Sequence, residues 1–108
     1  MAELITPLRF RESAGLDDWQ VGPGAASIRY RTPDFAAGAA FIGEIATIAD
    51  ELDHHPDVDL RYASVTIRTT THSEGGLTDR DVALAQRIAA AARAHGLAAE
   101  TAEDHDPG

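Results

Sequence analysis

The sequence contains no cysteine, and this absence excludes two kinds of stabilised structure. Without thiols the chain can form neither a disulfide framework nor a zinc site with thiolate ligands. The cellular compartment therefore cannot be inferred from the use of cysteine. The sequence also lacks any pattern typical of a serine or cysteine nucleophile placed beside its base, which argues against nucleophilic catalysis of that type.

Basic residues are scarce. Nine of them stand against 18 acidic residues, which gives a formal net charge of −9 at pH 7. A chain with this charge repels both the phosphates of a nucleic acid and the head groups of an anionic membrane. We therefore expect neither a nucleic acid nor a membrane as a direct partner.

Long apolar runs are missing as well. No stretch approaches the roughly 18 apolar residues of a membrane-spanning helix. The first residues, Met1–Pro7, lack the basic region and following apolar run that are typical of a signal peptide. We therefore expect a cytoplasmic protein.

The 108 residues are enough for one domain with a single hydrophobic core. We expect this domain to occupy residues 1–97. Residues 98–108 are rich in alanine, glutamate and aspartate without periodicity, which predicts a flexible acidic tail.

The start of the chain predicts a short helix and a β-hairpin. Residues 8–16 are weakly periodic and favour a short helix that Gly15 ends. Residues 18–21 and 26–31 are compatible with strands and flank a Gly-Pro-Gly sequence at 22–24. Two such runs around a turn of this composition are typical of an antiparallel hairpin.

A long helix follows. Asp34 is placed to cap it, and Pro56 disfavours helical geometry at the residue before it, so the helix should end near Asp53 or His54. Its apolar residues recur every three or four positions and predict a buried stripe. These are Phe35, Ala39, Phe41, Ile42, Ile45, Ile48, Ala49 and Leu52.

The second half predicts two strands and another helix. Apolar and polar residues alternate over residues 58–62 and again over 65–71. Thr78 and Asp81 then form a box-like cap for a helix that Gly96 is placed to stop. One face of this helix carries Val82, Ala85, Ile88, Ala89 and Ala92.

The element order is thus ββαββα, with a short additional helix at the start. Paired strands separated by helices favour an α+β two-layer sandwich. We expect a four-stranded antiparallel sheet with the helices on one face.

Three of the five histidines, His54, His55 and His72, fall where a regular element ends and a loop begins. Such ends are common places for functional sites. A histidine at the C-terminal end of a helix lies near the negative pole of the backbone dipoles, which favours the imidazolium form and suits it to donate a proton. The glycine pair after His72 would let the backbone approach a ligand closely.

Other interpretations of these residues remain open. The adjacent histidines can simply cap helix carbonyls, and His72 can be a solvated loop residue. A metal site is a further possibility because carboxylates lie near the histidines in sequence. We expect no metal, since no H-E-x-x-H spacing places two ligands on one helical face.

Several segments together resemble the pterin-4a-carbinolamine dehydratase family. They are Ala49-Asp50-Glu51-Leu52-Asp53-His54-His55-Pro56, Tyr62, Val65, Thr71-His72, Gly76-Leu77-Thr78 and Asp81. The resemblance extends without gaps from about Ile28 through Ile88. It implies the same sandwich fold that the periodicity predicts.

The resemblance also implies an activity. The reaction is dehydration of 4a-hydroxytetrahydropterin to quinonoid dihydropterin and water, a step in tetrahydrobiopterin recycling. It needs a proton delivered to the departing oxygen and another removed from N5, which suits groups that titrate near neutrality. By resemblance the catalytic residues are His54, His55 and His72, and the residues that contact the substrate or orient the imidazoles are Asp53, Thr70, Thr71, Asp50 and Asp81. Which histidine is the acid is left open.

The resemblance has consequences for partners and cofactors. It implies a pterin substrate that is itself an oxidised cofactor, so that no further cofactor is expected. It also implies a homodimer or homotetramer, and an aromatic amino acid hydroxylase in the same pathway. The chain departs from the family pattern at Asp50, where glutamate is common, and at Val58, Leu60, Arg61 and Ala63. These departures keep open an alternative, a non-catalytic assembly factor or transcriptional cofactor that acts through protein contacts.

Overall fold

The computed structural model describes residues 3–100 and begins with a short helix, α1 (Pro7–Glu12). Thr6 caps it by accepting a hydrogen bond from the backbone N–H of Arg9. The helix ends at Ser13, whose N–H donates to the carbonyl of Phe10. The prediction that Gly15 ends this helix is therefore wrong, because Gly15 lies in the following loop with φ 82°.

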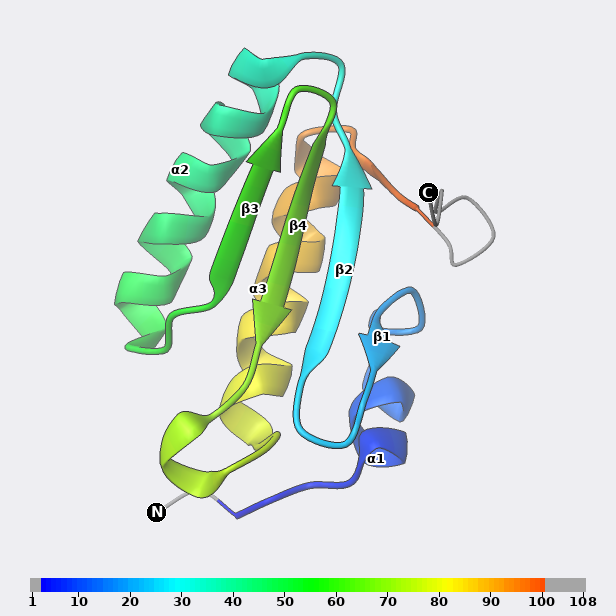
Figure 1. Cartoon of the computed structure of the whole chain (residues 1–108), viewed down its shortest axis with the longest axis vertical. Helices are drawn as coiled ribbons and strands as arrows, with labels where there is room; N and C mark the ends of the chain where they lie inside the picture. The colour runs from blue at the N-terminus through cyan, green and yellow to red at the C-terminus, as the bar shows by residue number, and fades with distance from the viewer. Residues whose placement is uncertain (1–2, 101–108) are drawn as a thin grey trace.

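An antiparallel sheet forms the middle of the molecule (Figure 1). Its path runs in the order β1-β2-β4-β3. The four strands are β1 (Gln20–Val21), β2 (Ala26–Arg31), β3 (Asp57–Arg61) and β4 (Ser64–Thr69). The predicted hairpin is confirmed, although its first strand is only two residues long.

A fifth strand, β5 (Ala98–Ala99), pairs antiparallel with β2. The backbone N–H of Glu100 continues this pairing by donating to the carbonyl of Arg29 at 2.7 Å. The sheet therefore has five strands and not four, and the predicted flexible tail is wrong for its first residues. The remaining part of that tail, residues 101–108, lies outside the described residues.

Two long helices, α2 (Phe35–Leu52) and α3 (Asp79–Ala94), cover one face of the sheet (Figure 1). A short 3₁₀ helix, η1 (His72–Glu74), lies between β4 and α3. This arrangement confirms the predicted α+β sandwich. Among residues 3–100, none of the helices has the length and apolar character that a membrane crossing requires.

The predicted apolar stripe of α2 is only partly buried. Phe41 and Ile45 lie in the core, whereas Phe35 is 51% exposed and Ala39 is also at the surface. At 100° per residue, Phe35 and Ala39 lie roughly 120° and 160° around the helix from Phe41. They therefore point away from the sheet, and the prediction that these two residues belong to the buried stripe is wrong.

The alternation predicted for the third and fourth strands is confirmed in β4 but not in β3. Val65 and Ile67 are fully buried. Val58 is 36% exposed and Tyr62 is 71% exposed, because β3 is an edge strand and Tyr62 lies in the turn that follows it.

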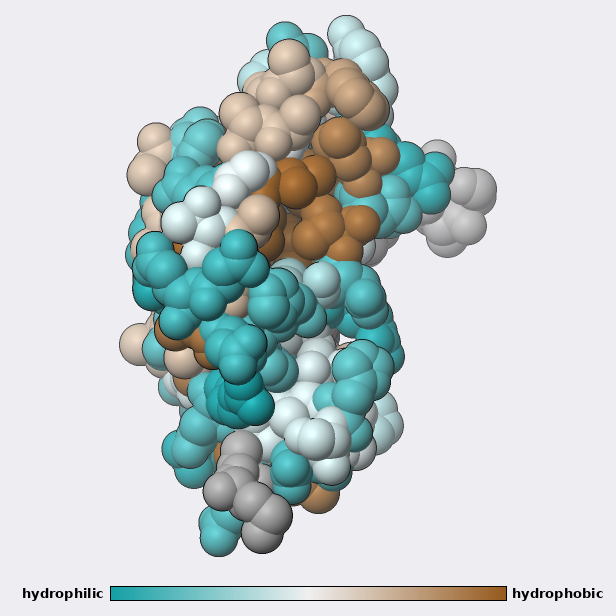
Figure 2. All heavy atoms as spheres, turned by 90° about the vertical axis from the view of Figure 1, so that its left-hand side faces the viewer, coloured by the Kyte–Doolittle hydropathy of each residue, from teal (hydrophilic) through white to brown (hydrophobic). Residues whose placement is uncertain are grey.

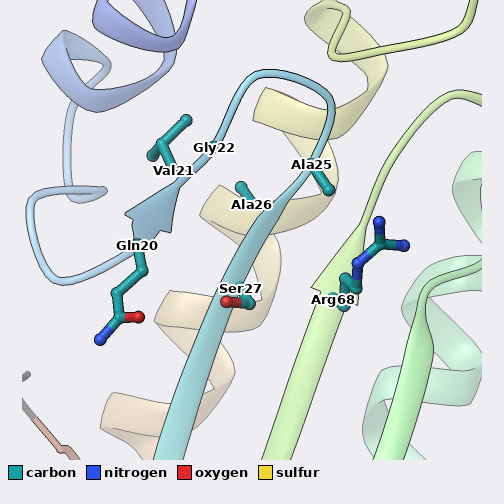
Figure 3. A pocket seen from close by; sticks show the side chains of 7 residues that line it. All are labelled: Gln20, Val21, Gly22, Ala25, Ala26, Ser27 and Arg68. Atoms are coloured by element: carbon teal, nitrogen blue, oxygen red, sulfur yellow. The ribbon is translucent and has the colours of Figure 1, made fainter.

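The opposite face of the sheet is polar. A hollow of about 340 Å³ on this face is lined by Gln20, Ser27 and Arg68, among others, and Figure 3 shows it with α3 behind the strands. Arg68 lies 3.7 Å from the carboxylate of Asp57. Its charge is therefore already partly balanced within the sheet.

Candidate functional site

The end of α2 separates the two adjacent histidines. Asp53 follows the last helical residue with φ 50° and ψ 45°, in the left-handed region, and its N–H donates to the carbonyls of Ala49 and Asp50. Arg80 fixes this turn by donating to the carbonyl of Asp53 at 2.6 Å. Beyond the turn, His54 is buried and His55 is exposed. The predicted end of the helix is confirmed, and the left-handed turn at Asp53 is its immediate cause.

His54 contacts a fully buried carboxylate. Its Nε2 lies 2.7 Å from Oδ1 of Asp81, which stands in the first turn of α3. Asp81 has no exposed surface, and the His54 residue is 8% exposed. Because an ionised carboxylate only accepts hydrogen bonds, Nε2 of His54 must carry a hydrogen. This contact fixes the tautomer and the orientation of the imidazole.

Three more donors converge on Asp81. The hydroxyl of Thr69 donates to Oδ1 at 2.5 Å, and the hydroxyl of Thr71 donates to Oδ2 at 2.6 Å. The backbone N–H of Thr78 also donates to Oδ2, at 2.9 Å, which is one half of the predicted capping box at the start of α3. Each carboxylate oxygen thus accepts two hydrogen bonds.

These contacts decide the charge of Asp81. Burial alone would raise the pKa of the carboxyl, but the hydrogen bonds from Thr69, Thr71, His54 and Thr78 together hold its pKa below the usual range. Hydrogen bonds to the charged form favour ionisation, so the carboxylate is a permanent anion at neutral pH. The cap and the candidate site therefore use the same side chain.

His55 belongs to a different contact. Its Nε2 lies 2.9 Å from Oδ1 of Asp50, and both side chains are exposed. The ring also lines a hollow of about 190 Å³ between α2 and β3, with Ile42, Pro56 and Val58 among the apolar side chains around it. The structure therefore joins Asp50 to His55 and Asp81 to His54.

The remaining predicted residues lie after β4. The hydroxyl of Thr70 donates to the carbonyl of Gly24 at 2.6 Å and ties this segment to the β1-β2 turn. His72 is exposed at the start of η1, next to Thr71 in the Asp81 network. The structure links His54 with Thr71 through Asp81. A shared pocket for all three histidines remains a prediction.

Two residues of this site were not predicted. Thr69 is fully buried on the inner face of β4, where its neighbours in the alternation are Val65 and Ile67. A hydroxyl at such a position needs a buried partner, which is a signal present in the sequence. The sequence contains no comparable signal for Arg80, because its hydrogen bond to the Asp53 carbonyl depends on the shape of the turn at Asp53.

No group of three or more histidine and carboxylate side chains within residues 3–100 is arranged to hold a metal ion. The charged contacts of the site are instead pairs, His54 with Asp81 and His55 with Asp50. This arrangement holds an imidazole in a defined tautomer beside a permanent anion. A side chain held in this way is suited to general acid–base catalysis.

Comparison with known proteins places the chain in a family. The family model described as pterin 4 alpha carbinolamine dehydratase matches residues 3–91. A protein of Metallosphaera sedula that provisionally bears this dehydratase name is 39% identical over 74 residues, which cover 68% of this chain and 77% of the relative. A Mycobacterium avium protein with the same provisional name is 41% identical over 73 residues, covering 68% and 78%.

Two solved structures are similar as well. A transcriptional coactivator/pterin dehydratase from Brucella melitensis has a TM-score of 0.75 and 32% identity, over 83% of this chain and 99% of that one. A pterin dehydratase-like protein identified as a RuBisCO assembly factor in the alpha-carboxysome has a TM-score of 0.56 over 68% and 86%, and at 24% identity it shows the fold alone. By the extent of the family match and the identity to its relatives, the chain belongs to the pterin 4 alpha carbinolamine dehydratase family.

Proposed function

We propose that the protein dehydrates 4a-hydroxytetrahydropterin to quinonoid dihydropterin and water. The observation that carries this proposal is the buried His54–Asp81 pair, with four hydrogen bonds on the carboxylate, in a chain of this family. The substrate is itself an oxidised pterin cofactor, so the reaction needs no other cofactor.

The reaction moves two protons and no net electrons. The C4a–O bond breaks, the departing hydroxyl takes a proton and leaves as water, and N5 loses its proton as the C4a–N5 double bond forms. A positioned general acid and a general base typically contribute about a hundred- to ten-thousandfold each to such a step. We assign these two tasks to His54 and His72, with either able to act as the acid.

Asp81 has a positioning role in this mechanism. With Nε2–H of His54 directed at the carboxylate, the opposite ring nitrogen, Nδ1, is the one available to exchange a proton with the substrate. The buried anion also stabilises the imidazolium that forms when His54 accepts a proton. Thr69, Thr71 and Thr78 hold the carboxylate in place.

The other predicted residues take supporting roles. Asp53 and His55 stand at the exposed end of α2, where they can contact the pterin, and Asp50 orients His55. The hydroxyl protons of Thr70 and Thr71 are used within the protein, on Gly24 and Asp81 respectively. We therefore propose that these two residues shape the site and do not donate their hydroxyl protons to the substrate.

The test is a direct assay. Chemically prepared 4a-hydroxytetrahydropterin is mixed with the purified full chain, and formation of the quinonoid product is followed by absorbance against the uncatalysed rate. We expect acceleration that a chelator leaves unchanged and that Asp81→Asn strongly reduces. Absence of acceleration by the folded protein would overturn the proposal, and activity that a chelator removes and zinc restores would replace acid–base catalysis with metal catalysis.

A second candidate function is assembly through protein contacts. Hydrophobic residues gather on the side of the molecule formed by α2 and β3 (Figure 2). Three large apolar side chains with substantial exposure are Phe35, Val58 and Tyr62. Contiguous apolar surface of this kind is typical of interaction sites. A folded chain that leaves the carbinolamine decay rate unchanged would favour this function over the enzyme.

A further inference from the structure

A cavity of about 320 Å³ lies at the other end of α3 from the proposed active site. Its walls come from β2, the C-terminal half of α3, β5 and the loop before β1. Arg93, which lines the cavity, is twelve residues along the helix from Asp81, which corresponds to about 18 Å at the usual rise per residue. The cavity is therefore separate from the histidine site.

Both apolar and polar side chains line the cavity. Ile28, Ala89, Ala92, Leu97 and Ala99 supply aliphatic surface. Asp18, Tyr30 and Arg93 supply a carboxylate, a phenol and a guanidinium. A concave site with apolar walls and a few convergent polar groups is the usual form of a small-molecule site, and this volume lies at the lower end of the roughly 300–1,000 Å³ range.

Tyr30 offers a hydroxyl without a partner. The residue is 4% exposed, and its ring packs edge-on against Phe41 with a centroid distance of 5.5 Å. Within the part of the chain that the structure describes, no hydrogen bond reaches the hydroxyl. Burial, with a smaller contribution from the Asp18 carboxylate, raises the pKa of this phenol to about 12. The group is therefore protonated at neutral pH and available as a donor.

Asp18 and Arg93 carry opposite charges on the same cavity. Both lie close enough to Tyr30 to affect its titration, in opposite directions. No ion pair joins them, and within residues 3–100 neither side chain has a hydrogen-bonding partner. Two unpaired charges of opposite sign beside an unpartnered donor match a ligand that carries both charges itself.

We propose that this cavity binds a free α-amino acid with an apolar side chain. Its ammonium group would contact Asp18, its carboxylate would contact Arg93 and the Tyr30 hydroxyl, and its side chain would lie on the aliphatic wall. A purely anionic ligand would face the Asp18 carboxylate and a net charge of −9, and a purely cationic one would face Arg93. The zwitterion satisfies both groups at once.

The experiment is a calorimetric and NMR titration of the full chain with leucine and with phenylalanine. Three probes serve as matched controls for leucine: 4-methylpentanoate lacks the ammonium group, isoamylamine lacks the carboxylate, and glycine lacks the apolar side chain. We expect the two amino acids to bind with dissociation constants of roughly millimolar or tighter and the controls to bind at least about tenfold more weakly. Chemical shift changes should concentrate on residues 89–99.

Variants locate the binding. Asp18→Asn and Arg93→Gln should each weaken binding by roughly tenfold or more, because each removes a charge-assisted contact. Asp17→Asn and Arg87→Gln remove the same charges from neighbouring positions that do not line the cavity, and they should leave binding unchanged. Dehydration of the pterin substrate should be unaffected in all four, so this proposal fails or stands independently of the proposed function.

Three results would overturn the proposal. The first is no binding of either amino acid to the folded protein. The second is equal binding of 4-methylpentanoate or isoamylamine, which would assign the cavity to another ligand class. The third is amino acid binding that survives in both Asp18→Asn and Arg93→Gln, since the site would then lie elsewhere.

Discussion

Thr69 donates a 2.5 Å hydrogen bond to Oδ1 of Asp81, the same carboxylate oxygen that contacts Nε2 of His54. The threonine stands on the inner face of β4, and the aspartate stands in the first turn of α3. This one contact therefore connects the sheet, a helix start and the candidate catalytic histidine. It makes the position of the carboxylate, and through it the position of His54, depend on a strand residue with no direct part in the chemistry.

Thr69→Val tests this relationship. Valine keeps the shape of threonine and removes one of the four donors to a buried carboxylate, so we expect a loss of about 1–3 kcal/mol in the free energy of unfolding. The dehydration rate should fall as well, because His54 is held less firmly. Thr66→Val is the control on the outer face of the same strand, and it should leave the rate unchanged. Equal effects in the two variants, measured by urea unfolding and initial rates, would contradict this role.

The depressed pKa of Asp81 predicts acid sensitivity. A carboxyl whose pKa is lower in the folded than in the unfolded protein stabilises the fold above its unfolded pKa, about 3.9. This stabilisation is lost as the pH falls from about 4 through the folded pKa. We therefore expect the urea midpoint to drop below about pH 4.

The Asp81→Asn variant should be less stable at neutral pH and should lack this component of the acid transition. Asp79→Asn changes an exposed carboxyl in the same turn and is the matched control, which should keep the acid transition of the parent chain. An Asp81→Asn variant with an unchanged acid transition would assign the sensitivity to other carboxyls.

The parts of the fold that follow local rules were predictable from the sequence. Residue type and spacing predict the caps at Asp34 and at Thr78 with Asp81, and the structure contains both. The turn between β1 and β2 followed from its glycines and proline. In each case the cause lies within a few residues of the effect.

What was missed depends on distant contacts. Strand β5 forms because Ala98 and Ala99 pair with a part of β2 that β1 leaves unpaired. No local pattern in the tail predicts this pairing. The buried cluster joins Asp81 of α3 to Thr69 of β4 and to His54 and Thr71, which follow α2 and β4. Resemblance to the family supplied three of these residues, but it supplied neither Thr69 nor the hydrogen bonds. The division between a buried His54 and an exposed His55 depends on the left-handed turn at Asp53.

Two glycines of α2 should respond differently to alanine. A Cβ at Gly43 would meet no atom within 4 Å, so Gly43→Ala should stabilise the helix by about 1 kcal/mol through propensity alone. A Cβ at Gly38 would lie 2.7 Å from Leu60 Cδ1 and 3.2 Å from Val65 Cγ2. Leu60 can shift, but Val65 is fully buried and β-branched, so overpacking should offset the gain.

We expect Gly38→Ala to be less stable than Gly43→Ala by roughly 1–3 kcal/mol. Thermal or urea unfolding of the two variants measures this difference within one helix. Equal stabilisation by both substitutions would show that the sheet can move away from α2 without cost.

His72→Ala should separate catalysis from folding. The side chain is exposed at the start of η1, so its loss should change the free energy of unfolding by no more than about 0.5 kcal/mol. Loss of a general acid or base should nevertheless reduce the dehydration rate by roughly a hundredfold or more. His54→Ala is the informative comparison, because it removes a donor from the buried Asp81 and should lower both stability and rate. Melting curves and initial rates from the same preparations decide the matter. If His72→Ala keeps the full rate, the histidine is a solvated loop residue, and the proton that we assign to it must come from another group.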